Sequence, residues 1–436
     1  MYRTVIERLE EWKGSASRKP LLLQGARQVG KTWVINEFGR TSFERVAYVN
    51  FMGNETMKEA FEGDLVPARL LQSVSIETGV AVDAANPQNS TLVVFDEIQE
   101  CPRAIMALKA FAEQMPQLPL IAAGSLLGVA LHAGVSFPVG KVDLLMMYPM
   151  TFYEYLLATD ESLAPVLNNR DYKLMDTFAD RFIGALKSYY FVGGMPEAVQ
   201  TFKDTGDYGQ VRNVQNRLLY GYEHDFSKYA DPLLSEKIRM LWASVPSQLG
   251  KENKKFVYSA VRKGARARGY EEAIQWLIDA GLVLKVNRVS KPGIPLRSYE
   301  DKDAFKLYMF DVGLLGAASD LSAQTLLEGS ALFTEFKGAL SENYVCQQLV
   351  ASGEMTPSYW SAEKSDGEVD FLYGYEGRVV PVEVKAETNL RAKSLKSFMG
   401  KYEIGKGIRL SLAGFEKQER IVNIPLYAAD VLPGWE

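Results

Sequence analysis

Eight consecutive residues near the N-terminus have the spacing of a polyphosphate-binding loop. The run Gly25-Ala26-Arg27-Gln28-Val29-Gly30-Lys31-Thr32 fits the pattern G-x-x-x-x-G-K-[ST]. It follows the apolar run Leu21–Gln24 and precedes a stretch with helical patterning. In this context backbone amides and the helix N-terminus face the phosphate oxygens. We expect the whole run to bind ATP, with Lys31 on the β and γ phosphates and the Thr32 hydroxyl on Mg²⁺.

An acidic pair after a buried-type strand could complete a magnesium-nucleotide site. The apolar run Leu92–Phe95 ends in Asp96 and Glu97. Because Mg²⁺ prefers carboxylate oxygens, Asp96 is the candidate metal partner, and Glu97 is placed to orient and deprotonate an attacking water. Ser125 follows another apolar run and could contact the γ phosphate or the water, although an ordinary turn residue would look the same. These residues predict ATP hydrolysis.

A second group of carboxylates occurs near the C-terminus. Glu342 lies in a predicted helix, Asp370 in a predicted strand, and Glu383-Val384-Lys385 ends the next strand. Alternate residues of a strand share a face, so Glu383 and Lys385 should point the same way, with Asp370 beside them. We expect Glu342, Asp370 and Glu383 to bind a divalent metal, and Asp370, Glu383 and Lys385 to act in phosphodiester cleavage. The alternative is a docking or nucleic-acid-sensing domain with a surface ion pair.

Local charge differs from the net charge of the chain. The 49 basic and 54 acidic residues give a net charge of −5, so the molecule as a whole has no field that attracts nucleic acid. Residues 251–268, however, contain seven basic residues against Glu252 alone, a local charge of +6. The basic residues are Lys251, Lys254, Lys255, Arg262, Lys263, Arg266 and Arg268. This run suits contacts with DNA phosphates, but a solvated face or an internal interface would have the same composition.

Four parts must position these residues. In residues 1–150 short apolar runs alternate with helical stretches, which predicts an α/β fold with a mostly parallel sheet whose ligands bind at the strand carboxyl ends. Residues 151–230 have helical patterning and are predicted to form a helical lid. Residues 231–325 place helices before two strands, as in a winged helix. Residues 326–436 open with a helix followed by strands, which predicts a separate α/β module.

Composition narrows the class of protein further. A chain of 436 residues has room for about three domains, and 47% hydrophobic with 24% charged residues is typical of globular proteins. Two histidines and two cysteines exclude a multi-histidine metal site or a disulfide framework. The N-terminus has no secretory signal pattern and no stretch fits a membrane span, so we expect a cytoplasmic protein without membrane contact.

The phosphate loop, the motif Phe95-Asp96-Glu97-Ile98-Gln99 and the segment Tyr148–Tyr155 resemble prokaryotic AAA+-type ATP-binding proteins. Segments Ala273–Leu282 and Phe305–Leu315 extend this resemblance over essentially the whole chain. The resemblance implies a P-loop ATPase core with an extra strand between the two motif strands, followed by a lid and a winged helix. Many relatives have an arginine where this chain has Lys141, so an arginine role is not carried over to that position.

The order of Glu342, Asp370 and Glu383-Val384-Lys385 resembles the PD-(D/E)XK nuclease superfamily, which implies a restriction-endonuclease-like C-terminal fold. The leading hypothesis is an Mg²⁺-dependent ATPase coupled to a winged-helix and nuclease-like half that binds or cleaves nucleic acid. The alternative is a nucleotide-regulated interaction switch with a catalytically inactive docking domain. A DNA-binding regulator that uses the basic winged helix is a third hypothesis. Assembly into a homo-oligomer is compatible with each of these.

Overall fold

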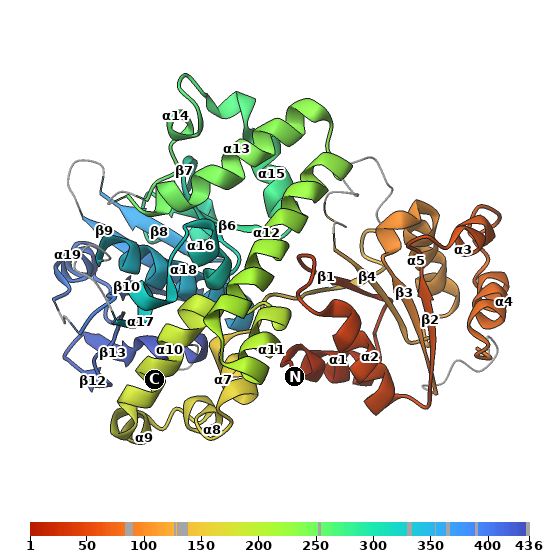
Figure 1. Cartoon of the computed structure of the whole chain (residues 1–436), viewed down its shortest axis with the longest axis horizontal. Helices are drawn as coiled ribbons and strands as arrows, with labels where there is room; N and C mark the ends of the chain where they lie inside the picture. The colour runs from red at the N-terminus through yellow and green to blue at the C-terminus, as the bar shows by residue number, and fades with distance from the viewer. Residues whose placement is uncertain are drawn as a thin grey trace. The chain divides into compact units, whose positions relative to one another are not determined.

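The first sheet of the computed structural model comes from the N-terminal third of the chain. Its strands are β1 (Leu21–Gln24), β2 (Arg45–Asn50), β3 (Thr91–Asp96), β4 (Leu120–Gly124) and β5 (Asp143–Met146). All neighbours pair in parallel, in the order β2-β3-β4-β1-β5 (Figure 1). β4 therefore lies between the strand that leads into the phosphate loop and the strand that ends in Asp96. This arrangement confirms the predicted P-loop NTPase sheet with its extra strand.

The structure describes residues 1–82, 90–125, 128, 138–251, 254–328, 334–353, 355–362, 367–388 and 391–432. Contacts divide the chain into two units. The N-terminal unit comprises Arg3–Tyr148 and Asp279–Gly281, and the C-terminal unit comprises Met1–Tyr2, Pro149–Ile278 and Leu282–Glu436. The described residues contain no helix that is long and apolar enough to cross a membrane.

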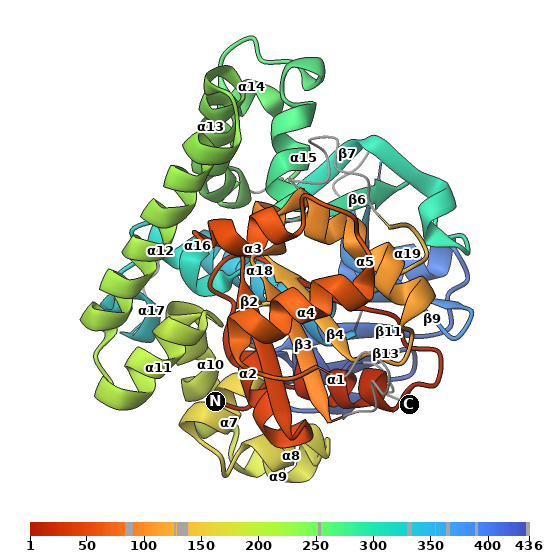
Figure 2. The same cartoon turned by 90° about the vertical axis from the view of Figure 1, so that its right-hand side faces the viewer.

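Helices cover both faces of the N-terminal sheet. The helices are α1 (Val5–Gly14), α2 (Lys31–Ser42), α3 (Glu55–Ala60), α4 (Pro67–Thr78) and α5 (Pro102–Gln114), and the 3-10 turn η1 spans Ile98–Glu100. Figure 2 shows α3, α4 and α5 in front of the sheet. The core beneath them includes Phe51, Phe61 and Phe95, whose rings meet edge to face at centroid distances of 5.3 to 5.7 Å. Because parallel crossovers are right-handed, α2 lies on the opposite face, and α1 packs beside it.

Residues 151–279 are mainly helical, as expected. Their helices are α7 (Phe152–Thr159), α8 (Ala164–Asn168), α9 (Tyr172–Thr177), α10 (Ala179–Val192), α11 (Pro196–Thr205), α12 (Tyr208–Tyr229), α13 (Pro232–Leu249), α14 (Tyr258–Val261), η2 (Ala267–Gly269) and α15 (Glu271–Asp279). Thr151 and Glu154 form a reciprocal capping box that starts α7. Gly193, with φ 74°, ends α10, and a Cβ there would lie 2.2 Å from the Asp311 carboxylate. Glycine is therefore required at this break.

The second sheet contains eight strands in the order β12-β13-β11-β10-β9-β8-β6-β7. The strands are β6 (Val283–Val289), β7 (Glu300–Met309), β8 (Ser358–Ser361), β9 (Glu368–Tyr375), β10 (Arg378–Val384), β11 (Gly407–Ser411), β12 (Glu416–Lys417) and β13 (Ile421–Pro425). β6 pairs with β8 in parallel through Arg288 and Tyr359. The strands expected in a winged helix and those expected in a separate C-terminal module thus share one sheet.

The remaining helices belong to the C-terminal unit, like the second sheet. They are η3 (Leu296–Tyr299), α16 (Val312–Ala318), α17 (Ala323–Glu328), α18 (Thr334–Gly353), α19 (Lys393–Lys401) and η5 (Leu426–Val431). α18 carries a buried polar face toward β7. Its Asn343 side chain accepts from the Met309 amide at 2.8 Å and donates to the Met309 carbonyl at 3.0 Å. Since Asn343 is fully buried, this reciprocal pair fixes α18 against the end of β7.

Candidate functional site

The backbone of the phosphate loop depends on its two glycines. Gly25 has φ 150°, and a Cβ at this position would lie 2.2 Å from the carbonyl oxygen of Met147. Gly30 has φ 96° and directly precedes α2. A side chain would strain either position. The loop therefore has the tight turn and the helix start that amide coordination of phosphate requires.

Lys31 is buried within the loop, with 7% of its surface exposed. Its Nζ donates to the carbonyl oxygens of Gly25 and Ala26, each at 2.9 Å. Burial lowers the pKa of Lys31 to about 8, although the nearby Glu97 and Asp96 charges act in the opposite direction. The ammonium group is thus held over the loop in protonated form near neutral pH, where a phosphate could replace the two carbonyls as its partner.

The predicted magnesium residues meet in the structure. Thr32 Oγ1 donates to Asp96 Oδ2 at 2.8 Å, and the amide of Glu97 donates to Asp96 Oδ1 at 2.9 Å. The first turn of α2 and the end of β3 bring these residues together across 64 positions of sequence. A hydroxyl beside a carboxylate is a set of hard oxygen donors that fits Mg²⁺, which would supply charge neutralisation for the phosphates.

Glu97 and Ser125 lie at the same carboxyl edge of the sheet. Glu97 has φ 50°, in the left-handed region that non-glycine residues rarely adopt. Its carboxylate accepts from the Gln99 side chain, and Ser125 Oγ lies 3.5 Å from Glu97 Oε2. The structure thus brings the candidate base and the candidate serine together, while Lys141 pairs with Glu113 at 2.9 Å on the surface.

Sequence reasoning missed two side chains at this site. Gln99 contacts Glu97, and the Tyr48 hydroxyl on β2 donates to Asp96 Oδ2. Gln99 belongs to the acidic motif, and its short spacing from Glu97 could have suggested the contact. Tyr48 lies in neither motif, and only the pairing of β2 with β3 places it near Asp96.

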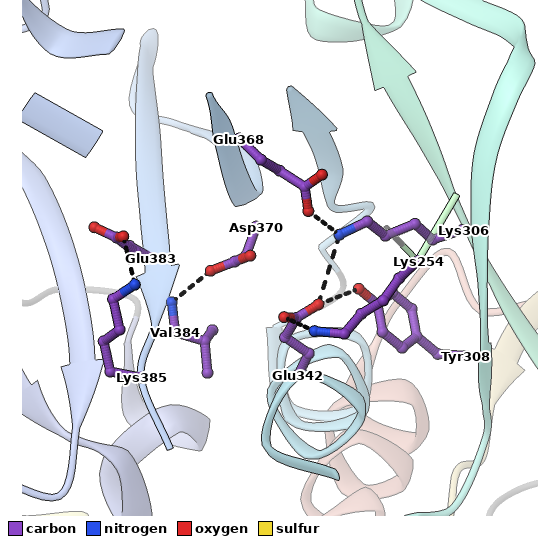
Figure 3. Close-up of polar contacts among 9 residues, drawn as sticks. All are labelled: Lys254, Lys306, Tyr308, Glu342, Glu368, Asp370, Glu383, Val384 and Lys385. Atoms are coloured by element: carbon purple, nitrogen blue, oxygen red, sulfur yellow. Dashed lines mark hydrogen bonds and ion pairs between the residues drawn. The ribbon is translucent and has the colours of Figure 1, made fainter. Parts of the chain in front are cut away.

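The C-terminal carboxylates occur in two neighbouring groups (Figure 3). Glu342 on α18 accepts from Lys254 and from the Tyr308 hydroxyl at 3.1 Å, and Lys306 Nζ lies 3.5 Å away. Burial opposes ionisation of Glu342, but Lys254 and Lys306 outweigh it and lower the pKa of Glu342 to about 2. Lys306 also pairs with Glu368. Glu342 is therefore an ionised partner of two lysines.

Asp370 and Glu383 contact different groups. Asp370 Oδ2 accepts from the Val384 amide at 2.7 Å, while Glu383 pairs with Lys385 at 2.8 Å on the other side of Val384 in Figure 3. Burial, and then the charge of Glu342, raise the pKa of Asp370 to about 7. Among the residues that the structure describes, no three or more His, Cys, Asp or Glu side chains are grouped to hold a metal.

Glu342, Asp370 and Glu383 thus do not form one group of potential metal ligands in this structure, and the metal site predicted from them stays a prediction. Lysine ammonium groups already neutralise Glu342, and the separate partners of Asp370 and Glu383 direct these two carboxylates apart. Lys254 and Lys306 were not predicted to be in this region. The predicted catalytic roles of Asp370, Glu383 and Lys385 stay predictions.

The basic run around α14 and η2 is largely exposed. Its exposed basic residues are Lys251, Lys255, Arg262, Lys263, Arg266 and Arg268. Lys254 is the exception, because 13% of its side chain is exposed where it pairs with Glu342. Glu252, the one acidic residue of the run, lies outside the described residues. The described part of the run therefore presents positive charge to solvent.

Comparison with family models covers three segments of the chain. Residues 17–156 match the model described as AAA domain. The N-terminal unit is an AAA domain. Residues 183–325 and 337–428, which follow the AAA domain, match two models described as domains of unknown function (DUF8612 and DUF4143). The AAA match includes the phosphate loop and the Asp96-Glu97 motif.

Among solved structures, the chain is similar to the Walker-type ATPase PABY2304 of Pyrococcus abyssi, with 15% identity, 73% coverage of this chain, 95% of that chain and a TM-score of 0.44. The chain is also similar to the ORC1 protein of Aeropyrum pernix, solved in complex with DNA, with 14% identity and a TM-score of 0.28. This match covers 72% of this chain and 90% of the ORC1 chain. A third similar structure is a signal transduction ATPase with numerous domains from Pyrococcus horikoshii, which carries a tetratricopeptide repeat sensor. It is 11% identical, with a TM-score of 0.27, and the match covers 79% of this chain and 45% of that chain. No curated protein matches the chain.

Proposed function

We propose that the AAA domain binds ATP with Mg²⁺ and hydrolyses it. The observation that carries this proposal is the contact of Thr32 with Asp96 at 2.8 Å, with the Glu97 carboxylate on the next residue. P-loop hydrolysis needs a hydroxyl side chain for the metal, a carboxylate beside it and a residue that positions the attacking water. Thr32, Asp96 and Glu97 supply these groups.

Different residues of the site bind the phosphates, hold the metal and accept the proton of the attacking water. Amides of the phosphate loop bind the β and γ phosphates, and Lys31 exchanges its contacts with the Gly25 and Ala26 carbonyls for phosphate oxygens. Thr32 and Asp96 hold the metal. Glu97 accepts the proton of the attacking water, and Ser125, 3.5 Å from Glu97, orients that water or the γ phosphate.

Phosphate release tests this proposal. Wild type should release phosphate from ATP only with Mg²⁺, and Lys31→Ala should lose both nucleotide binding and release. Glu59→Gln, which removes an exposed charge on α3, is the matched control and should behave as wild type. Wild-type release no faster than that of Lys31→Ala would remove the ATPase proposal.

We further propose that the six exposed basic residues between Lys251 and Arg268 bind the phosphate backbone of DNA in response to the nucleotide state. The six exposed basic side chains support it, because each phosphate contact releases counterions. Charge reversal of Arg262, Lys263 and Arg266 should weaken DNA binding and flatten its salt dependence. Reversal of the exposed Lys173, Lys203 and Lys417 is the matched control. Equal salt dependence in the two triple variants would contradict DNA binding by the run.

A specific observation also favours the alternative function, a nucleotide-regulated switch whose C-terminal half docks a partner without cutting nucleic acid. Glu342 is already neutralised by Lys254 and Lys306, so it does not need a metal for charge compensation. On this alternative, wild type, Asp370→Ala and Lys385→Ala should all be inactive on DNA and RNA with Mg²⁺ or Mn²⁺. Cleavage by wild type that both substitutions abolish would support the nuclease hypothesis instead.

A further inference from the structure

Among the residues that the structure describes, three donate hydrogen bonds to the carboxylate of Asp96, and one of these donors lies outside the two nucleotide motifs. Thr32 and Tyr48 both donate to Oδ2, and the Glu97 amide donates to Oδ1. Asp96 is 2% exposed, so these donors replace water around the carboxylate. Two of them belong to the motifs, and the third is the phenol of Tyr48.

The register of the sheet explains how Tyr48 reaches Asp96. In the parallel pairing of β2 with β3, Tyr48 lies opposite Val94. Asp96 is two residues beyond Val94, so its side chain lies on the same face as that of Val94 and of Tyr48. A diagonal neighbour at this spacing is within reach of an aromatic side chain. Tyr48 thus spans the diagonal from the edge strand to the end of β3.

The Tyr48 hydroxyl is the donor in its contact with Asp96. A neutral hydroxyl has one proton to donate, and Asp96 Oδ2 receives it. The hydrogen bond therefore fixes the rotation of the carboxylate about its Cβ–Cγ bond, with Oδ2 toward Thr32.

We propose that Tyr48 is a positioning residue for the magnesium site, which orients the Asp96 carboxylate for the metal. This inference rests on the proposed function, in which Thr32 and Asp96 hold Mg²⁺. Partners that hydrogen-bond a metal-binding carboxylate typically change metal affinity by about 10-fold to 100-fold when removed. Tyr48→Phe keeps the ring and deletes only the donor, so it isolates this contribution.

The test is a titration of the full chain with Mn²⁺ in the presence of a non-hydrolysable ATP analogue. Electron paramagnetic resonance measures the concentration of free Mn²⁺ at each point. Tyr48→Phe should weaken Mn²⁺ binding about 10-fold, while its affinity for the analogue in EDTA stays that of wild type. Tyr48→Met, which fills the space without a donor, should give the same shift. Tyr220→Phe removes an exposed hydroxyl of α12 and is the matched control, with no expected change.

Three results would overturn the inference. The first is a Mn²⁺ affinity of Tyr48→Phe within about 2-fold of wild type, since loss of a partner that hydrogen-bonds a metal ligand typically weakens metal binding by about 10-fold to 100-fold. The second is an equal loss of analogue affinity in EDTA, which would indicate general damage to the site. The third is a wild type that binds neither analogue nor Mn²⁺, which would remove the proposed function itself, whereas the first two leave it standing.

Discussion

The ammonium group of Lys306 on β7 lies 3.5 Å from the carboxylate of Glu342 on α18, and the Lys306 side chain is completely buried. Lys306 also pairs with Glu368 on β9. Although burial disfavours its charge, Glu342 and Glu368 raise the pKa of Lys306. One lysine therefore neutralises carboxylates from two elements of the C-terminal unit, and its removal should have a large effect on stability.

Lys306→Met should destabilise the C-terminal unit. The substitution leaves Glu342 and Glu368 without their shared cation. Removal of one partner of a buried ion pair typically lowers the free energy of unfolding by about 3 to 5 kcal/mol. Urea unfolding at pH 7 measures the change. Lys302→Met on the exposed part of the same strand is the control and should change stability by less than about 0.5 kcal/mol. Equal effects of the two substitutions would contradict a role for the buried cluster.

Asp430 should make stability decrease as pH rises. Burial raises the pKa of Asp430 to about 7, while Tyr153 donates its amide to Oδ2 at 2.9 Å. The pKa of Asp430 in the folded protein exceeds its value of about 3.9 in the unfolded chain. The free energy of unfolding therefore contains the full contribution of protonated Asp430 below about pH 4, and this contribution is lost as the pH rises through 7. Asp430→Asn keeps the acceptor and should be more stable than wild type by about 4 kcal/mol at pH 8.

The comparison is made by urea unfolding from pH 4 to pH 8. Asp311 and Asp370, whose pKa values burial also raises, titrate in both proteins, so the difference between variant and wild type isolates Asp430. The difference should vanish near pH 4. Asp303→Asn, at an exposed position, should give no pH-dependent difference. A constant difference across the range would show that Asp430 does not ionise within it.

Nucleotide affinity should fall at alkaline pH because of Lys31. Its pKa in the free protein is lowered to about 8 by burial, so protonated Lys31 becomes scarce above that pH. Phosphates bind the charged form, and the affinity for ATP should fall by about 10-fold per pH unit well above pH 8. Calorimetry between pH 7 and 9.5 measures this.

Lys31→Arg provides the internal comparison. A guanidinium stays charged throughout this range, so the variant, even if it binds ATP more weakly, should show no alkaline loss. A wild-type affinity that does not change with pH would contradict the assigned environment of Lys31.

The nucleotide site was predictable because its chemistry is local in sequence. The phosphate loop and the Asp96-Glu97 motif each lie directly after a strand, and parallel strands bring their carboxyl ends to one edge. The contact of Thr32 with Asp96 follows from that geometry. Tyr48 was not predictable, because its contact depends on the register of β2 against β3, and a tyrosine in a strand is ordinary.

The C-terminal cluster was only partly predictable. Lys254 lies 88 residues from Glu342, and Lys306 lies 62 residues from Glu368. Lys306 also pairs with Glu342, and no local pattern joins these residues. Lys306 alternates with apolar neighbours and so has the pattern of an exposed strand face, yet it is buried because β7, α18 and β9 meet around it. The single register pair of β6 with β8, which joins two predicted domains into one sheet, also has no sequence signal.

The measurement that tests ATP hydrolysis most directly is single-turnover cleavage of labelled ATP by wild type and Glu97→Gln, with ATP binding measured on the same samples. Glu97→Gln keeps the shape of the side chain and removes the base, so we predict nearly unchanged ATP binding and cleavage at least about 100-fold slower. Cleavage by Glu97→Gln at the wild-type rate would contradict the account, because the carboxylate beside Asp96 would then have no part in hydrolysis.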